Sequence, residues 1–201
     1  MRIAYVLLAA GNASRFGSCK QLAEVDGQAV IQHSLNTLKA VLETQSADVE
    51  GSVEEKPTPF VVLGAYQAEI TPYITPQTSI IVNPDWQLGL GASIAKATEV
   101  IDDLNEYDGI LFTLADQIKV TVSDLNQLLD GFDGNRISAA FYANKPGVPA
   151  IFPSSQFAAL KDLVGKNGAK SLLMEPKLPL NRQNMKNALF DIDYPEDIEK
   201  Y

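Results

Sequence analysis

The sequence predicts an α/β fold: a single domain, residues 1–201, in which a mostly parallel Rossmann-like sheet lies between two layers of helices. Two observations predict it. Apolar runs of strand length alternate with amphipathic segments of helix length, which is typical of a parallel sheet covered on both faces. The strand-like runs also lack polar alternation, as strands buried on both faces do. A chain of 201 residues is long enough for one such domain with a large core.

The N-terminal part predicts one strand, one helix and a long loop. Residues 3–8 (IAYVLL) form a buried strand; MRIAYVLLAAG also resembles a signal peptide, but its short apolar run leads directly into a charged loop. Residues 30–42 carry apolar side chains at helical spacing, which places His33 on the solvent-facing side. The polar, acidic and proline-ended stretch 43–59 is predicted to be a surface loop.

The rest of the chain continues the alternation of strands and helices. No apolar run reaches the ~20 residues that a membrane-spanning helix needs, so we expect no membrane partner. The C-terminal tail, 188–201, reads as a strand followed by a short helix. The other predicted strands are 60–65, 79–84, 109–116, 136–143 and 147–152, and the other predicted helices are 91–104, 121–132, 154–164 and 168–174.

Charge and cysteine content exclude some classes of function. The formal net charge is −9, whereas broad binding to nucleic-acid backbone needs a basic face, so we expect no nucleic-acid partner. Cys19 is the single cysteine, which rules out an intrachain disulfide and fits a cytoplasmic protein. A nucleophilic role for Cys19 is disfavoured because no base stands beside it in the sequence.

The loop after the first strand, within LLAAGNASRFGSCKQL (7–22), carries the features of a phosphate site. Gly11 lacks a Cβ, so backbone can approach a phosphate closely, and successive N–H groups can surround its oxygens. Arg15 can bind phosphate through two donors, while Lys20 supplies a mobile point charge. From spacing alone, two solvated loop charges explain Arg15 and Lys20 about equally well.

Two common phosphate loops do not match. A Walker A loop requires Gly-Lys-[Ser/Thr], but Gly17 is followed by Ser18, Cys19 and then Lys20. A dinucleotide fingerprint requires a third glycine, but the nearest match, GLGASI, has Ile94 there and follows no strand.

Five segments, in order along the chain, resemble the MobA-like nucleotidyltransferases. VNPDWQLGLGASIAKA (82–97), LADQ (114–117), GVPAIF (147–152) with LVGKNGAKSLL (163–173), and DIDYPEDI (191–198) are similar to later motifs of that family. The first segment is its signature loop, matched by Leu8, Ala9, Ala10, Gly11, Ser14, Arg15, Gly17, Lys20 and Leu22.

Within the family, the Asp-Gln and Asp-x-Asp motifs resemble the molybdenum cofactor cytidylyltransferases. That resemblance implies a nucleotide-diphospho-sugar transferase type of fold with an antiparallel strand in the sheet. It also implies transfer of CMP from CTP to molybdopterin carrying molybdenum, release of pyrophosphate, Mg²⁺ as cofactor and a molybdoenzyme or its chaperone as partner. Ile118, Val148 and Tyr194 depart from the branch pattern. GTP as donor, a sugar phosphate or small phospho-acid as acceptor, and a catalytically silent nucleotide- or cofactor-binding chaperone stay open.

The resemblance also implies roles for individual residues. Asp116 would hold the metal, although an Asp after a strand can also be a turn or capping residue. Asp191 and Asp193 lie two apart on the predicted tail strand, so they would point to the same side, and we slightly prefer Asp191 as the second ligand. Ser93 would cap its helix as well as contact the nucleotide, and Trp86 would pack rather than stack on the base. The predicted catalytic residues are Arg15, Lys20 and Asp116; the predicted nucleotide-binding residues are Leu8, Ala9, Ala10, Gly11, Arg15, Lys20, Asn83, Gly91 and Ser93; and the predicted metal ligands are Asp116, Asp191 and Asp193.

Overall fold

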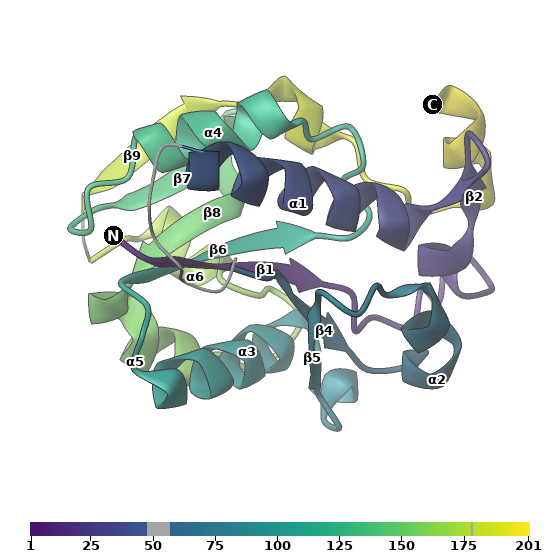
Figure 1. Cartoon of the computed structure of the whole chain (residues 1–201), viewed down its shortest axis with the longest axis horizontal. Helices are drawn as coiled ribbons and strands as arrows, with labels where there is room; N and C mark the ends of the chain where they lie inside the picture. Colours follow the sequence, from purple (N-terminus) through teal and green to yellow (C-terminus); the bar gives the residue numbers. More distant parts are fainter. Residues whose placement is uncertain (48–56, 178) are drawn as a thin grey trace.

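The computed structural model describes residues 1–47, 57–177 and 179–201, and a seven-stranded sheet forms its centre (Figure 1). The strand order is β5-β4-β1-β6-β8-β7-β9. All neighbours are parallel except at β8, which runs antiparallel to both β6 and β7. The strands are β1 (Ile3–Leu8), β4 (Phe60–Leu63), β5 (Ser79–Val82), β6 (Gly109–Leu114), β7 (Ile137–Tyr142), β8 (Lys145–Pro153) and β9 (Leu180–Asn184), and a separate hairpin pairs β2 (Glu24–Val25) with β3 (Gln28–Ala29).

Helices cover both faces of the sheet (Figure 1). One face is covered by α1 (Val30–Ala47) and α4 (Val122–Asp130). The other is covered by α3 (Leu90–Leu104), α5 (Phe157–Lys161) and α6 (Lys170–Met174). The remaining elements are short: α2 (Gln67–Ile70) and the 3₁₀ turns η1 (Lys20–Leu22), η2 (Thr71–Tyr73), η3 (Trp86–Leu88), η4 (Ser154–Gln156), η5 (Lys186–Leu189) and η6 (Pro195–Lys200).

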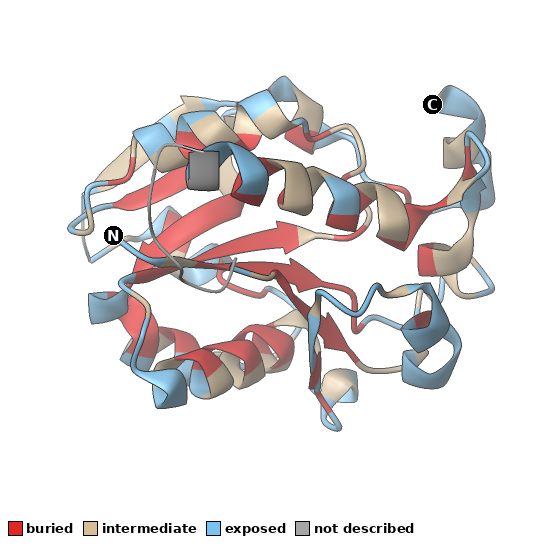
Figure 2. Ribbon diagram, viewed as in Figure 1, coloured by how far each residue is buried: buried red, intermediate tan, exposed pale blue. Residues whose placement is uncertain are grey.

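The alternation of side chains along β1 divides the core into two layers. Leu7 packs in the same buried cluster as Leu35 of α1, whereas Val6 packs with Ile94 of α3 on the opposite face. Successive side chains of a strand point to opposite faces, so one continuously apolar strand supplies both layers. Figure 2 shows the result: the central strands and the sheet-facing sides of the helices are buried. Among the described residues, no helix combines the length and apolar character needed to cross a membrane.

The predicted three-layer architecture and its antiparallel strand are confirmed, but two local predictions are wrong. Residues 43–47 continue helix α1 instead of starting the loop predicted for 43–59, because an amphipathic helix tolerates polar residues beyond the core. Residues 48–56 of that predicted loop lie outside the described residues. The tail has no strand over 188–193: it passes from η5 into irregular backbone, and Ile192 donates its N–H to the carbonyl of Asp116, outside any ladder. The sheet edge is formed instead by β9, whose polar sequence LNRQN gave no strand signal.

The order of the strands creates a switch point between β1 and β6. From β1 the chain proceeds to β4 and β5 on one side, and then returns to β6 on the other side of β1. Loops that leave the carboxyl ends of two such strands diverge, and open α/β sheets bind ligands in the resulting crevice. The loop after β1 carries Gly11, Arg15 and Lys20, and the loop after β6 carries Asp116, so the fold brings the two predicted site segments together.

Candidate active site

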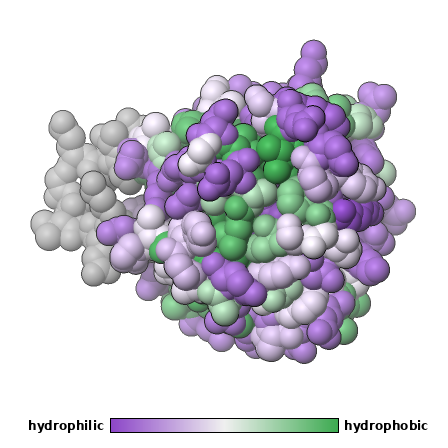
Figure 3. All heavy atoms as spheres, turned by 90° about the vertical axis from the view of Figure 1, so that its right-hand side faces the viewer, coloured by the Kyte–Doolittle hydropathy of each residue, from purple (hydrophilic) through white to green (hydrophobic). Residues whose placement is uncertain are grey.

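A cleft of about 600 Å³ opens at the switch point, within the size range of small-molecule sites. Figure 3 shows this side of the molecule, where an apolar area is surrounded by hydrophilic side chains. Residues from both loops line it, together with the start of α3 and a residue of the C-terminal tail. The lining residues used below are Leu8, Ala9, Ala10, Gly11, Asn12, Ala13, Arg15, Lys20, Gln21, Trp86, Leu90, Ser93, Asp116, Lys166 and Asp193.

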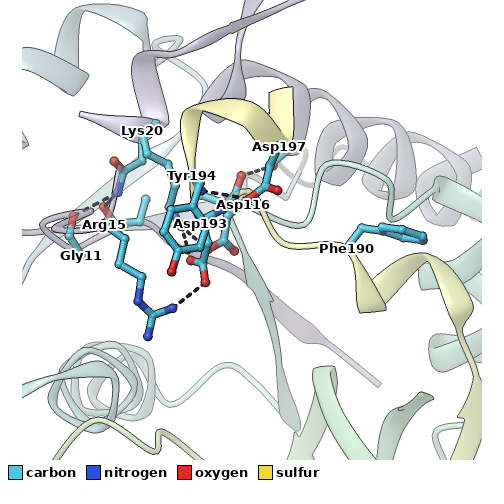
Figure 4. Close-up of polar contacts among 12 residues, drawn as sticks. Gly11, Arg15, Lys20, Asp116, Phe190, Asp193, Tyr194 and Asp197 are labelled. Carbon is cyan, nitrogen blue, oxygen red and sulfur yellow. Dashed lines mark hydrogen bonds and ion pairs between the residues drawn. The ribbon is translucent and has the colours of Figure 1, made fainter. Parts of the chain in front are cut away.

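Two cations and two carboxylates form a connected network in this cleft (Figure 4). The Lys20 ammonium donates to Asp116 Oδ2 at 2.7 Å and to Asp193 Oδ1 at 3.4 Å. The other oxygen of Asp193 accepts from the Arg15 guanidinium at 2.7 Å. Lys20 is the most enclosed member, with 12% of its side chain exposed, whereas Arg15 is 64% exposed. Arg15 can therefore exchange partners with little rearrangement, while Lys20 is held at the centre of the network.

Contacts of Ile192 fix the C-terminal tail beside Asp116, and Asp197 holds the backbone of the two residues that follow Ile192. The N–H of Ile192 donates to the Asp116 carbonyl at 3.1 Å, and the fully buried Ile192 side chain packs in a small cluster with Val25 and Val30. The carboxylate of Asp197 accepts the backbone N–H groups of Asp193 and Tyr194 at 3.0 and 2.9 Å. Together these contacts bring Asp193 to the cleft, although it lies 77 residues after Asp116 in the sequence.

Asp116 and Asp193 together fit a magnesium site. The Asp116 Oδ1 atom is buried and has no hydrogen-bond partner among the described residues, so an acceptor is left for a ligand. Mg²⁺ prefers oxygen ligands and is usually held by one or two carboxylates together with substrate phosphates and waters. Within the described residues, no group of three or more His, Cys, Asp or Glu side chains is arranged to hold a metal by itself.

Asp191, the slightly preferred second ligand, has a different environment from Asp193. It is not one of the residues that line the cleft. Loss of hydration raises the pKa of its carboxyl to about 6, and the negative charge of Asp116 contributes further, although the side chain still reaches solvent. Asp193 shares Lys20 with Asp116 and faces the cleft, so the geometry favours Asp193 over Asp191 as the partner of Asp116.

The other predicted nucleotide-binding positions divide into those at the cleft and those behind it. Leu8, Ala9, Ala10 and Gly11 line the cleft, and a Cβ at Gly11 would have no atom within 4 Å, so packing does not require glycine there. The Ser93 side chain also lines it.

Asn83 and Gly91 are not among the residues that line the cleft. Asn83 donates to Ser93 Oγ at 3.0 Å, and both residues are buried. A Cβ at Gly91 would come within 2.7 Å of the Val164 backbone, so Gly91 permits close packing. The predicted capping role of Ser93 is wrong: the helix begins at Leu90, and Gly89, with φ +100°, precedes it.

Three residues excluded or discounted from the sequence also have clear positions. Burial raises the pKa of the Cys19 thiol, and its Sγ lies 3.6 Å from the Gln21 side-chain oxygen, so no base activates it. His33 is half-buried, less exposed than expected, with Nε2 2.8 Å from the Val25 carbonyl. Trp86 packs against the core on the α3 side and also lines the cleft.

Sequence reasoning missed three residues that shape the cleft. Gln21 is buried beneath the loop after β1, the Tyr66 hydroxyl reaches the same loop, and Lys166 lines the cleft from the segment before α6. Gln21 stands next to Lys20 in the family-like loop, so its position was a usable signal. Lys166 lies within the family-like segment 163–173, which was also a usable signal, whereas Tyr66 has no local sequence feature that marks it.

Comparison with known proteins agrees with this geometry. Residues 5–181 match the family model of the MobA-like NTP transferase domain. The purine catabolism protein PucB from Bacillus subtilis (strain 168) is 29% identical over 207 residues, covering 96% of this chain and 93% of that protein.

Solved structures show the same fold. Rv0371c from Mycobacterium tuberculosis H37Rv has a TM-score of 0.81 at 22% identity, covering 100% of this chain and 96% of that one. Its complex with manganese has a TM-score of 0.73 at 21% identity, covering 100% and 97%. Molybdopterin-guanine dinucleotide biosynthesis protein A from Archaeoglobus fulgidus has a TM-score of 0.64 at 17% identity, covering 100% and 96%. Because the family model spans most of the sequence, the chain belongs to the MobA-like NTP transferase domain family and is a nucleotidyltransferase.

Proposed function

We propose that the protein transfers CMP from CTP to the phosphate of a molybdopterin-type acceptor and releases pyrophosphate. The observation that carries the proposal is the convergence of Lys20 and Arg15 with Asp116 and Asp193 on one cleft at the switch point of the sheet. On a protein of net charge −9, this local arrangement supplies the positive charge that a triphosphate requires.

The reaction joins two anions, so the site has to neutralise charge and align the partners. The acceptor phosphate attacks the α-phosphate in line, and its positioning accounts for most of the catalytic demand. Arg15, which is exposed and paired with Asp193, would bind phosphate oxygens through two donors. Lys20 would stabilise the negative charge that develops on the departing pyrophosphate.

The cleft needs no dedicated general base. A phosphate monoester has a second pKa near ~6 and is largely dianionic at pH 7, so it can attack without losing a proton to the protein. His33 is the single histidine of the chain and does not line the cleft. The proposed chemistry therefore needs no histidine in the cleft.

Asp116 and Asp193 are the residues that would hold Mg²⁺. The metal would supply Lewis-acid polarisation of phosphate oxygens and a template for their orientation. The manganese complex of Rv0371c supports a divalent metal in this fold. Lys20 lies between the same two carboxylates and pairs with both.

CTP and a molybdopterin-type acceptor are the preferred substrates for two reasons. Asp116-Gln117 and Asp191-x-Asp193 resemble the cytidylyltransferase branch, and the A. fulgidus relative is named for molybdopterin-guanine dinucleotide biosynthesis. That name also makes GTP the alternative donor. We place the reaction in the cytoplasm, where the lone Cys19 stays reduced, and we propose a molybdoenzyme or its chaperone as the recipient of the product.

Thermal unfolding with each of the four NTPs and Mg²⁺ tests the donor, because a selectively bound ligand raises apparent stability. Pyrophosphate release is then measured with molybdopterin, sugar-phosphate and phospho-acid acceptors. CTP-selective stabilisation with molybdopterin-dependent release supports the proposal. GTP selectivity changes the donor, release with another acceptor changes the acceptor, and nucleotide binding without turnover indicates a binding chaperone. If no NTP stabilises the protein, the proposed function is wrong.

A further inference from the structure

The loop after β1 is held from below by one buried glutamine. The Gln21 side-chain amide donates to the Ala9 carbonyl and to the Gly11 carbonyl, both at 3.1 Å. Gln21 is only 4% exposed, and it belongs to η1, the turn that also presents Lys20. The Gln21 side chain therefore joins the two ends of the loop: one end is the backbone that leaves β1, and the other is the turn that carries Lys20.

The carbonyls between and beyond these two are also bonded to the protein. Ala10 accepts the backbone N–H of Ala65 at 3.1 Å, and Asn12 accepts the Tyr66 hydroxyl at 3.2 Å. Ala65 and Tyr66 follow β4, the neighbour of β1 in the sheet, so this support comes from a different part of the chain than Gln21. Four successive carbonyl groups, residues 9–12, are thus bonded to the protein.

Fixing these carbonyls also fixes the amide groups that follow them. A peptide unit is planar, and its N–H points opposite to its C=O, so each bonded carbonyl sets the direction of the next N–H. In the described parts of the chain, the N–H groups of residues 10–13 donate no hydrogen bond, and all four residues line the cleft. Backbone donors are normally paired, so these four are available for ligand oxygens.

We propose that Gln21 and Tyr66 are positioning residues for polyphosphate binding: by holding the carbonyls of the loop, they present the N–H groups of residues 10–13 to phosphate oxygens. The inference rests on the proposed function, since it names how this loop would bind the triphosphate. A glutamine suits the role because its amide has two donor hydrogens, one for each carbonyl. Glutamate at this position could accept but not donate, and its charge would oppose the phosphates.

Calorimetric binding of Mg·CTP and of Mg·pyrophosphate tests the inference on four proteins: wild type, Gln21→Met, Tyr66→Phe and Gln156→Met. Methionine keeps the length of glutamine without its donors. Gln156 is also buried, at 7%, but does not line the cleft, so it is the matched control. From the usual net value of a hydrogen bond, Gln21→Met should raise the Kd for both probes by roughly 10- to 100-fold and Tyr66→Phe by about 3-fold, with no change for Gln156→Met.

Pyrophosphate separates a phosphate effect from a nucleoside effect. In Gln21→Met, KM for CTP should rise by a larger factor than kcat falls, while circular dichroism shows a folded protein. A residue that only stabilised the fold would not change KM in a protein that is still folded. Unchanged affinity of folded Gln21→Met, or weakened binding of CTP but not of pyrophosphate, overturns the inference. If Gln21→Met does not fold, Tyr66→Phe decides, because it removes one hydroxyl at an exposed contact; wild-type affinity there overturns the inference. A wild type that binds neither probe refutes the proposed function instead.

Discussion

Replacing Lys20 by methionine removes the cation that lies between Asp116 and Asp193 while keeping the length of the side chain. The ammonium lies 2.7 Å from Asp116 Oδ2 and 3.4 Å from Asp193 Oδ1, so Lys20→Met removes the cation that pairs with Asp116 and leaves Asp193 with Arg15. The substitution should therefore lower both stability and turnover, and the two losses can be measured separately.

The loss of stability follows from the partial burial of the Lys20–Asp116 pair. Their side chains are 12% and 22% exposed, so the pair is intermediate between a surface pair and a fully buried pair. A surface pair contributes about 0.2–1 kcal/mol to stability, whereas disruption of a fully buried pair costs about 3–5 kcal/mol. We expect Lys20→Met to lower the free energy of unfolding by about 1–2 kcal/mol. For a domain of this size, that corresponds to a fall of roughly 3–6 °C in the unfolding temperature.

The loss of turnover should be much larger than this change in stability explains. Removing one donor that stabilises transition-state charge costs about 100- to 1,000-fold in kcat. Pyrophosphate release should be measured well below the unfolding temperature of the variant, with CTP and acceptor saturating. Lys161→Met is the matched control, because Lys161 forms a 2.7 Å ion pair with Asp102 outside the cleft and should leave kcat unchanged. If folded Lys20→Met keeps kcat and kcat/KM within about threefold of the wild-type values, the loss of rate is far smaller than the loss of one transition-state donor causes. Lys20 would then have no part in the chemistry.

Four further predictions test the neighbouring groups. Asp116→Asn should shift the Mg²⁺ titration of activity to higher concentrations; an unchanged curve would exclude Asp116 as a ligand. Gly11→Ala should leave the unfolding temperature unchanged, because a Cβ there meets no atom within 4 Å, but should weaken CTP binding, since Gly11 lines the cleft; equal affinity would contradict this. The pKa of Asp191 is raised to about 6, so the stability that its protonated carboxyl contributes is complete below pH ~4 and is lost as pH rises through about 6. With a chelator present, the free energy of unfolding of Asp191→Asn should therefore rise by about 1 kcal/mol relative to that of wild type between pH 4 and 7, a value reduced for the exposure of the side chain. A difference between the two proteins that does not change with pH would refute the raised pKa. Burial raises the pKa of Cys19, so the native thiol should alkylate at pH 7 more slowly than a free peptide thiol; equal rates would contradict this.

The architecture could be predicted because its determinants are local. The apolar run of β1 and the helical spacing that follows it specify a buried strand and an amphipathic helix, whatever the rest of the chain does. The failures have equally local causes. β9 is polar along LNRQN because it forms the sheet edge, and the apolar residues of the tail serve a small cluster around Ile192 instead of a sheet.

The site was only partly predictable, because its members meet across long sequence distances. Arg15 and Asp193 are 178 residues apart, yet their side chains form a 2.7 Å ion pair. The family-like motifs marked Lys20, Asp116 and Asp193 one by one, but the Asp-x-Asp spacing could not decide which aspartate faces the cleft. The backbone bond from Ile192 to Asp116 decides it, and that bond depends on the path of the whole tail.

The ion-pair network also constrains how a ligand can enter. Arg15 and Lys20 are bonded to carboxylates, so phosphate oxygens have to compete with Asp193 for Arg15 and with Asp116 for Lys20. A divalent cation bound by these carboxylates would remove that competition, because it satisfies the oxygens that otherwise hold the two side chains. Nucleotide and metal binding should therefore be positively coupled, and linkage requires the coupling to be the same in both directions. The same two carboxylates thus offset the charge of Arg15 and Lys20 and, once they bind a divalent cation, would leave both side chains to phosphate oxygens.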